Sequence, residues 1–223
     1  MELRERFSRL YLGVVYDALR FDLNEREPFV VHRECKPIYP LRAEEFVFGP
    51  AFTCRGERVS DPAHVDDAVR IRMFQSFTPG CVQVIDAGGD DTVAHFGDIS
   101  GKLARKFGAV GAVIDGYSRD ARIIEQDRFP VFCRGTQPTD AYGKWQIVAY
   151  QVPVFLAGPE GRVKVCPGDY VYADPDGVIV IRAGSVAEVC RLAEARVERE
   201  NLVRRELRET SDIQALYDRI GRW

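Results

Sequence analysis

The sequence predicts an α/β fold, and two stretches of the chain carry this prediction. Between residues 81 and 133, short apolar runs alternate with amphipathic patterns, which is typical of a sheet layered with helices. The predicted elements are strands at 81–86, 110–114 and 130–133 and helices at 98–107 and 119–126. Residues 147–181 then hold five short β patterns separated by turn dipeptides, with no helical pattern between them.

Helical patterns are also expected nearer the N-terminus. Apolar residues recur every three or four positions from Leu3 to Ala18, and a second stripe runs from Val65 to Phe77. Between these two stripes, four prolines make residues 24–50 irregular in the predicted structure.

A long C-terminal helix is predicted from Val186 onward, with Ser185 as its N-cap. The helix becomes strongly charged beyond Glu198. It either packs on a neighbour or another subunit, or it lies solvated at the surface. Because no linker, repeat or low-complexity tract interrupts the sequence, we predict a single domain over residues 1–223.

Composition restricts the partners of the chain. The 223 residues carry a net charge of −3 with basic and acidic residues interleaved, so we expect no nucleic-acid partner. No apolar run approaches the roughly 20 residues that span a bilayer, so we expect no membrane partner. The six cysteines are scattered without Cys-x-x-Cys spacing, and the N-terminus lacks a signal-peptide pattern. We therefore expect a reduced, cytoplasmic protein.

Candidate chemistry centres on Gly97-Asp98-Ile99-Ser100, at the start of a predicted helix. Free backbone N–H groups in the first turn of a helix bind carboxylates and phosphates. Gly97 allows a ligand to approach the backbone closely. The alternative is that Asp98 merely caps its own helix.

A second candidate segment is Arg119-Asp120, which follows a predicted strand and the Gly116 turn. Arginine can grip a carboxylate with two parallel hydrogen bonds, and an aspartate offers the hard oxygen that Mg²⁺ or Mn²⁺ accepts. The alternative is an ordinary surface ion pair. His95 precedes Gly97 and could line the site, although a structural role is the more ordinary interpretation.

Together these residues resemble the RraA-like family, the regulators of ribonuclease activity A, which includes class II 4-hydroxy-4-methyl-2-oxoglutarate aldolases. Asp98 and Arg119-Asp120 are separated by 20 residues, which fits that family's Asp-x20-Arg-Asp pattern. Further similar stretches follow in order along the chain: Asp17-Ala18-Leu19, Gly49-Pro50-Ala51-Phe52-Thr53, Val113-Ile114-Asp115-Gly116 and Pro167-Gly168-Asp169.

The resemblance implies a three-layer β/β/α swivelling-type fold with a long C-terminal helix, assembled as a homotrimer or hexamer. It implies that Arg119 and the segment Gly97, Asp98, Ile99 and Ser100 bind a small 2-oxo acid, that Asp120 anchors Mg²⁺ or Mn²⁺, and that Asp98 orients metal-bound water. A C-terminal acid of the adjoining subunit would complete the metal shell. The candidates are Glu194, Glu198 and Glu200.

The implied activity is a metal-dependent lyase reaction, either retro-aldol cleavage or oxaloacetate decarboxylation, because both pass through pyruvate enolate. The alternatives are a non-catalytic protein that regulates a ribonuclease and a different metal-assisted reaction on the same scaffold. Tyr16, Ser100 and Ile123 stand where the family more often has serine, leucine and an acid. The alternative of a different metal-assisted reaction is suggested by Tyr16, Ser100 and Arg122.

Overall fold

The computed structural model describes residues 2–61 and 67–221, which form two compact units. The larger unit runs from Glu27 to Gly184, and the smaller combines the residues up to Arg26 with those from Ser185 onward. The single domain over residues 1–223 stays a prediction.

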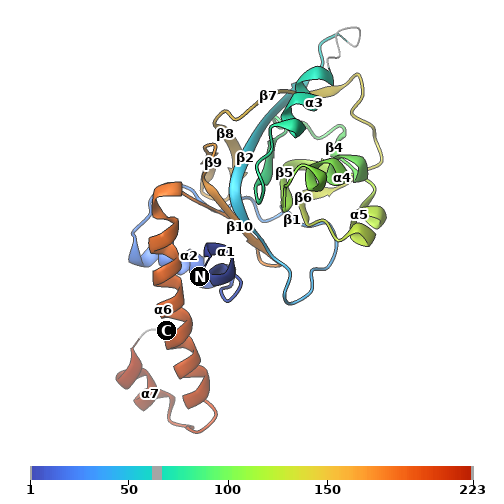
Figure 1. Ribbon diagram of the computed structural model, residues 1–223. Helices are drawn as coiled ribbons and strands as arrows, with labels where there is room; N and C mark the ends of the chain where they lie inside the picture. The colour runs from blue at the N-terminus through green and yellow to red at the C-terminus, as the bar shows by residue number, and fades with distance from the viewer. Residues whose placement is uncertain (1, 62–66, 222–223) are drawn as a thin grey trace. The chain divides into compact units, whose positions relative to one another are not determined.

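The larger unit is built on a nine-stranded mixed sheet (Figure 1). Its main path runs β1 (Lys36–Pro37), β6 (Val131–Thr136), β5 (Gly111–Ser118), β3 (Val82–Asp86), β2 (Val47–Arg58), β10 (Tyr170–Asp174) and β11 (Gly177–Ile181). Off this path, β4 (Ala94–Phe96) pairs with β5 and β7 (Trp145–Tyr150) pairs with β2. The pairs β2–β3, β3–β5 and β5–β6 are parallel, so their carboxyl ends meet at one edge, where ligands of α/β sheets commonly bind.

Alternate side chains of the central strands fill two apolar layers. On β5, Ala112 and Ile114 join a core with residues of the helices α3 (Asp67–Gln75), α4 (Asp98–Lys106) and α5 (Ala121–Asp127). Val113 between them joins a second core with the hairpin of β8 (Val154–Gly158) and β9 (Gly161–Val165). Successive side chains of a strand thus point to opposite faces of the sheet, one covered by helices and the other by the β8–β9 hairpin. This arrangement of three layers confirms the predicted β/β/α fold.

Two buried aspartates fix the hairpin against the carboxyl ends of neighbouring strands. Asp86 on β3 accepts a hydrogen bond from the Phe155 N–H at 3.2 Å, and Asp115 on β5 accepts one from the Ala157 N–H at 2.6 Å. Both amides belong to β8, which pairs with β9 along one edge only. The two carboxylates accept hydrogen bonds from β8 along its other edge, where no strand pairs with it. The two aspartates are therefore structural.

The structure corrects several predicted boundaries in the larger unit. β2 begins inside the stretch expected to be irregular and continues through Pro50. β4 was not predicted, because three residues carry no period. The predicted helix at 119–126 begins at Ala121, because Asp120 adopts a left-handed φ of 59° that a helix cannot contain. Of the second apolar stripe, Val65 lies outside the described residues.

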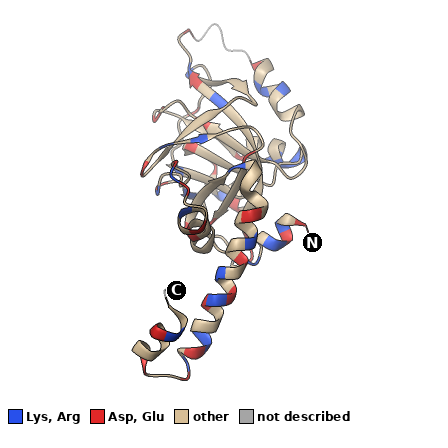
Figure 2. Cartoon of the chain, turned by 90° about the vertical axis from the view of Figure 1, so that its left-hand side faces the viewer, with Lys and Arg blue, Asp and Glu red and all other residues tan. Residues whose placement is uncertain are grey.

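The smaller unit contains the helices α1 (Leu3–Phe7), α2 (Leu12–Asp17), α6 (Val186–Glu206) and α7 (Ile213–Ile220) and a π-helix at Ala18–Asp22. The apolar stripe predicted one continuous N-terminal helix, but the structure has a break between α1 and α2. The amides of Arg9 and Leu10 close a tight turn there. Figure 2 shows basic and acidic residues interleaved along α6. Ser185 is the N-cap as predicted, but its side chain makes no capping hydrogen bond.

Two further predictions concern surface and redox state. No helix among the described residues is long and apolar enough to cross a membrane. All six cysteines are free, and every one except Cys166 is buried. Burial raises the pKa of the Cys133 thiol to about 11, so this side chain stays protonated and inert at neutral pH.

Candidate active site

A pocket with a volume of about 270 Å³ lies in the larger unit, and its lining includes Arg119, Asp120 and the segment Gly97–Ser100, which were predicted to bind substrate and metal. Its rim is formed by Gly97, Asp98, Ile99, Ser100, Arg119, Asp120 and Asp140, and five of these seven side chains are polar or charged. Its inner wall is mostly apolar and includes Met73, Phe74, Ile85, Trp145 and Ile147. The volume is below the range typical of pockets for drug-sized ligands, so a small metabolite fits it best.

Gly97 and Asp98 form the start of α4. Gly97 is the N-cap with an extended backbone and has no side chain to offer the helix. Asp98 is therefore not the N-cap residue of α4, but its carboxylate accepts a hydrogen bond from the Ile99 backbone in the first turn, so part of its role is local to this helix. Asp98 is the first helical residue, and its Oδ2 lies 3.0 Å from the Nζ of Lys102. This ammonium group holds the pKa of the Asp98 carboxyl below its usual value.

Asp120 brings the two predicted segments together. It is the N-cap of α5, yet its carboxylate makes no hydrogen bond to that helix. Instead, its Oδ2 accepts a hydrogen bond from the Asp98 N–H at 3.3 Å. A Cβ added at Gly97 would lie 2.7 Å from this oxygen, so only glycine permits the approach. The left-handed backbone of Asp120 thus aims its carboxylate at the N-terminus of α4 rather than along its own helix.

Arg119 lies between two carboxylates on the rim. Its Nη1 is 2.7 Å from the Oδ2 of Asp140, and its Nε is 3.5 Å from the Oδ2 of Asp120. The Arg119 side chain is 38% exposed, so the guanidinium is open to a ligand as well as to these partners. The sequence did not point to Asp140, because a lone acid in a loop between β6 and β7 has no local signature.

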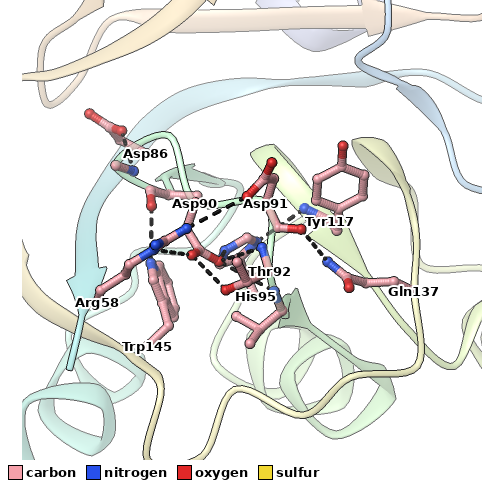
Figure 3. Close-up of polar contacts among 12 residues, drawn as sticks. Arg58, Asp86, Asp90, Asp91, Thr92, His95, Tyr117, Gln137 and Trp145 are labelled. Carbon is pink, nitrogen blue, oxygen red and sulfur yellow. Dashed lines mark hydrogen bonds and ion pairs between the residues drawn. The ribbon is translucent and has the colours of Figure 1, made fainter. Parts of the chain in front are cut away.

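Behind the rim, a hydrogen-bond network surrounds the buried carboxylate of Asp90 (Figure 3). This carboxylate accepts from the Nε of Arg58 at 2.6 Å, the hydroxyl of Thr92 at 2.8 Å and the Nε2 of His95 at 3.0 Å. Burial alone raises the pKa of the Asp90 carboxyl, but the bonds from Thr92, Arg58 and His95 outweigh it and hold this pKa at about 2.

His95 connects the strand that leads to Gly97 with the strand that leads to Arg119. Its Nδ1 accepts the Tyr117 N–H at 3.1 Å, so the ring proton sits on Nε2 and faces Asp90. Burial lowers the pKa of His95 and keeps the imidazole neutral. Because both ring nitrogens are engaged, this side chain positions β4 against β5 and has no free nitrogen for proton transfer.

The rim suits a hydrated hard cation rather than a closed metal cage. Among the described residues, no group of three or more His, Cys, Asp or Glu side chains is arranged to hold a metal ion. The oxygens of Asp98, Asp120 and Asp140 nevertheless line one pocket. Mg²⁺ commonly keeps several waters and binds through one or two carboxylates together with the substrate. These carboxylates are donors of the kind that Mg²⁺ or Mn²⁺ accepts, and the role of Asp120 as the metal ligand stays a prediction.

The C-terminal acids proposed to reach a neighbouring subunit all lie on α6, in the smaller unit. Glu194 pairs with Arg6, whose Nε lies 2.8 Å from its Oε1. Glu200 hydrogen-bonds to Tyr11 and to Arg204. Glu198 is solvent-exposed. The role of one of these acids in a neighbouring site stays a prediction.

The three departures from the family pattern occupy different environments. Ser100 lines the pocket, as predicted. Ile123 is 37% exposed on α5. Tyr16 lies in the smaller unit, where its ring packs edge-on against Phe21 at 6.3 Å between centroids.

Comparison with known proteins decides the family. A family model described as RraA-like, Aldolase/RraA, matches residues 14–180. The chain belongs to this family. A protein of Halalkalibacterium halodurans named "Putative 4-hydroxy-4-methyl-2-oxoglutarate aldolase" is 36% identical over 159 residues, which cover 71% of this chain and 70% of that protein.

Two solved structures are similar over nearly the whole chain. Streptomyces coelicolor RraAS2, described as an unusual member of the RNase ES inhibitor RraA protein family, has a TM-score of 0.74 at 26% identity and covers 91% of this chain and 95% of its own. An uncharacterised protein of Pseudomonas syringae pv. tomato has a TM-score of 0.78 at 24% identity, covering 96% and 95% of the two chains. The second likeness supports the fold alone.

Proposed function

We propose that the protein is a divalent-metal-dependent lyase that cleaves or decarboxylates a small 2-oxo acid through pyruvate enolate. The observation that carries the proposal is the meeting of an arginine, an aspartate and the N-terminus of a helix whose N-cap residue is a glycine, all on the rim of one small pocket. The aldolase name carried by the Halalkalibacterium halodurans relative is consistent with it.

The carboxylate of the substrate would bind at Arg119 and the first-turn amides of α4. The guanidinium offers a planar pair of donors, and the helix N-terminus adds partial positive charge. To take this place, the substrate carboxylate must displace Asp140 from the Nη1 of Arg119. The ion pair between Arg119 and Asp140 is half exposed, so solvent screening makes it easy to replace.

Asp120 would hold the divalent ion, mostly through water, and the ion would supply positive charge to the keto oxygen of the substrate. Arg119 adds a second positive charge next to the same oxygens. In cleavage of a 4-hydroxy-2-oxo acid, the bond between C3 and C4 breaks and its electron pair forms the enolate. The C4 hydroxyl gives its proton to water and becomes a carbonyl, and C3 later takes a proton from water to give pyruvate.

Asp98 would orient a water molecule beside the substrate. Because Lys102 lowers the pKa of its carboxyl, Asp98 stays ionised at neutral pH and can accept a hydrogen bond from water. Its position at the first residue of α4 places this acceptor beside the amides that bind the carboxylate.

We also propose that the chain assembles as a homotrimer or hexamer and works in the reducing cytoplasm. The interleaved charges on α6 would suit contacts with another copy, and the six free thiols are consistent with a reducing compartment. Light scattering coupled to size-exclusion chromatography tests the assembly. A monomeric mass across the micromolar range would contradict it.

The activity is tested by measuring pyruvate release from 4-hydroxy-4-methyl-2-oxoglutarate, other 4-hydroxy-2-oxo acids and oxaloacetate. We expect turnover with added Mg²⁺ or Mn²⁺ and loss of turnover with EDTA. Absence of pyruvate from the whole panel with metal present would contradict the proposal.

Ribonuclease regulation is the second candidate function. The observation that favours it is the structural similarity to RraAS2, a member of an RNase inhibitor family. If this function applied instead, an Arg119→Ala variant would inhibit a ribonuclease of the RNase E type as well as the wild type does. The two functions are thus separated by one variant assayed in two ways.

A further inference from the structure

The inner wall of the pocket contains one polar group that the proposed chemistry does not use. Gln83 lies on β3, lines the pocket, and is 1% exposed. Its carbonyl oxygen Oε1 is buried without a hydrogen-bond partner among the described residues. Its amide nitrogen contacts only sulfur atoms, the Sγ of Cys54 at 3.9 Å and the Sδ of Met73 at 3.8 Å.

Two other buried polar groups of this region are satisfied. The hydroxyl of Thr53, on the neighbouring strand, donates to the Val152 carbonyl at 2.6 Å. The indole N–H of Trp145 donates to the Ala87 carbonyl at 3.1 Å. The oxygen of Gln83 is therefore an acceptor that the fold leaves open, next to the space where a ligand would lie.

A buried hydrogen-bond acceptor without a donor costs about 1–3 kcal/mol of stability. A leucine or methionine at position 83 would fill a similar volume without this cost. Residues that reduce stability in this way are typical of binding sites, where the partner is the ligand. Because oxygen accepts hydrogen bonds, the missing partner must be a donor.

Charge separates the two ends of the pocket. Arg70 and Arg119 are the cations among its described lining residues, and both side chains are more than a third exposed, at 42% and 38%. Arg70 also lies 3.5 Å from Asp67. The inner wall includes Met73, whose Sδ lies 3.8 Å from the Gln83 amide nitrogen, and Phe74, whose ring centroid lies 5.9 Å from the Arg70 guanidinium. A carboxylate placed beside Gln83 would be paired only by drawing Arg70 away from Asp67 and from solvent, which is unfavourable.

We propose that Gln83 determines substrate specificity by accepting a hydrogen bond from a hydroxyl group on the inner end of the 2-oxo acid. The inference rests on the proposed function and names its substrate class. The preferred substrates are 4-hydroxy-2-oxo acids whose C4 substituents are small and uncharged, so that cleavage releases pyruvate and an aldehyde or ketone. The apolar side chains beside Gln83 contact those substituents.

The test compares Gln83→Leu with wild type on two reactions. One is cleavage of 4-hydroxy-2-oxopentanoate, which carries the hydroxyl. The other is decarboxylation of oxaloacetate, which lacks the hydroxyl and whose C4 is a carboxylate, so that wild type should turn it over less efficiently. We expect kcat/KM for the hydroxylated substrate to fall by tenfold or more, because one hydrogen bond is lost. We expect kcat/KM for oxaloacetate to change less than threefold. Gln146→Leu, at another glutamine that lines the pocket, should leave the ratio of the two rates unchanged.

Binding and stability give readouts that are independent of turnover. By calorimetry without added metal, wild type should bind 4-hydroxy-2-oxopentanoate about tenfold more tightly than 2-oxopentanoate, and Gln83→Leu should bind both equally. The urea midpoint of Gln83→Leu should rise, because the unpaired acceptor is removed.

Three results would overturn the inference: equal losses on both reactions, preference for a substrate whose C4 carries a second carboxylate, or a lower urea midpoint for Gln83→Leu. If wild type turned over neither compound, the proposed function itself would fail.

Discussion

The network around Asp90 and the rim around Arg119 are connected through His95 on β4 and Tyr117 on β5, but their polar groups differ in burial and in partners. Asp90 is 5% exposed and accepts hydrogen bonds from three side chains. Arg119 is 38% exposed and shares its charge between two carboxylates that a ligand can replace. The first arrangement fixes β4 against β5, and the second leaves the residues at their ends available for binding. Substitutions should therefore affect stability at one region and activity at the other.

The largest effect is expected at Arg119. Arg119→Ala should lower kcat/KM for pyruvate formation by about 10³-fold, because it removes a preorganised charge from the reacting oxygens. The free energy of unfolding should change by less than about 0.5 kcal/mol, because the side chain is partly exposed. Arg122→Ala, at an exposed arginine three positions further on, is the matched control for both assays.

Asp90→Ala should produce the opposite pattern. We expect a loss of about 2–4 kcal/mol in the free energy of unfolding, measured by urea denaturation, because Arg58 and His95 lose their buried acceptor. The control is Asp91→Ala, whose carboxylate is 77% exposed and lies 3.6 Å from the same arginine. A similar loss in both variants would show that burial of Asp90 is not the cause.

Gly97→Ala tests the contact that joins the two halves of the rim. The added methyl group would lie 2.7 Å from the Oδ2 of Asp120 and should push this carboxylate away. We expect kcat/KM to fall by roughly tenfold to a hundredfold, because a displacement of about 1 Å can have this effect. Gly184→Ala, where a new Cβ meets nothing within 4 Å, should retain full activity.

The His95 imidazole predicts a pH dependence of stability. Its pKa is lowered by burial in the folded state, whereas the unfolded chain takes up a proton near pH 6.5. This contribution to stability is complete above about pH 6.5 and is lost as the pH falls toward the folded-state pKa. Urea denaturation between pH 8 and 5 should show this loss in wild type and a shallower one in His95→Gln. Parallel curves would contradict the assignment.

The smallest effect is expected at Asp140. Asp140→Asn removes the charge that competes with the substrate for Arg119, so KM should decrease about twofold to fivefold while kcat stays nearly constant. Steady-state kinetics with oxaloacetate measure both constants. An increase in KM would show instead that Asp140 helps to bind the substrate.

The sequence predicted the parts of the site that depend on local pattern. Gly97 at a helix start and Arg119-Asp120 after a strand are visible in the chain itself, and the structure brings both to one pocket. Pro50 concealed β2, since proline usually argues against a strand. The left-handed backbone of Asp120 could not be predicted from the apolar pattern, so the start of the following helix was predicted two residues too early.

Other features depend on contacts between distant segments and were beyond prediction. Asp140 meets Arg119 only because the loop after β6 returns to the rim. His95 was a candidate, but its two engaged nitrogens depend on Asp90 and on the Tyr117 amide. The Oε1 of Gln83 is unpaired because no neighbouring group donates a hydrogen bond to it. The spacing of residues in the sequence cannot predict this.

The central claim is that the rim of this pocket binds a carboxylate and a divalent ion together. It is tested most directly by titrating Mn²⁺ with and without oxalate, which resembles pyruvate enolate, and following the Mn²⁺ signal by electron paramagnetic resonance. Oxalate should tighten Mn²⁺ binding at least tenfold in wild type. Asp120→Asn should abolish the binding, and Arg119→Ala should retain Mn²⁺ but lose the effect of oxalate. Mn²⁺ binding that is unchanged by oxalate and by both substitutions would contradict the claim.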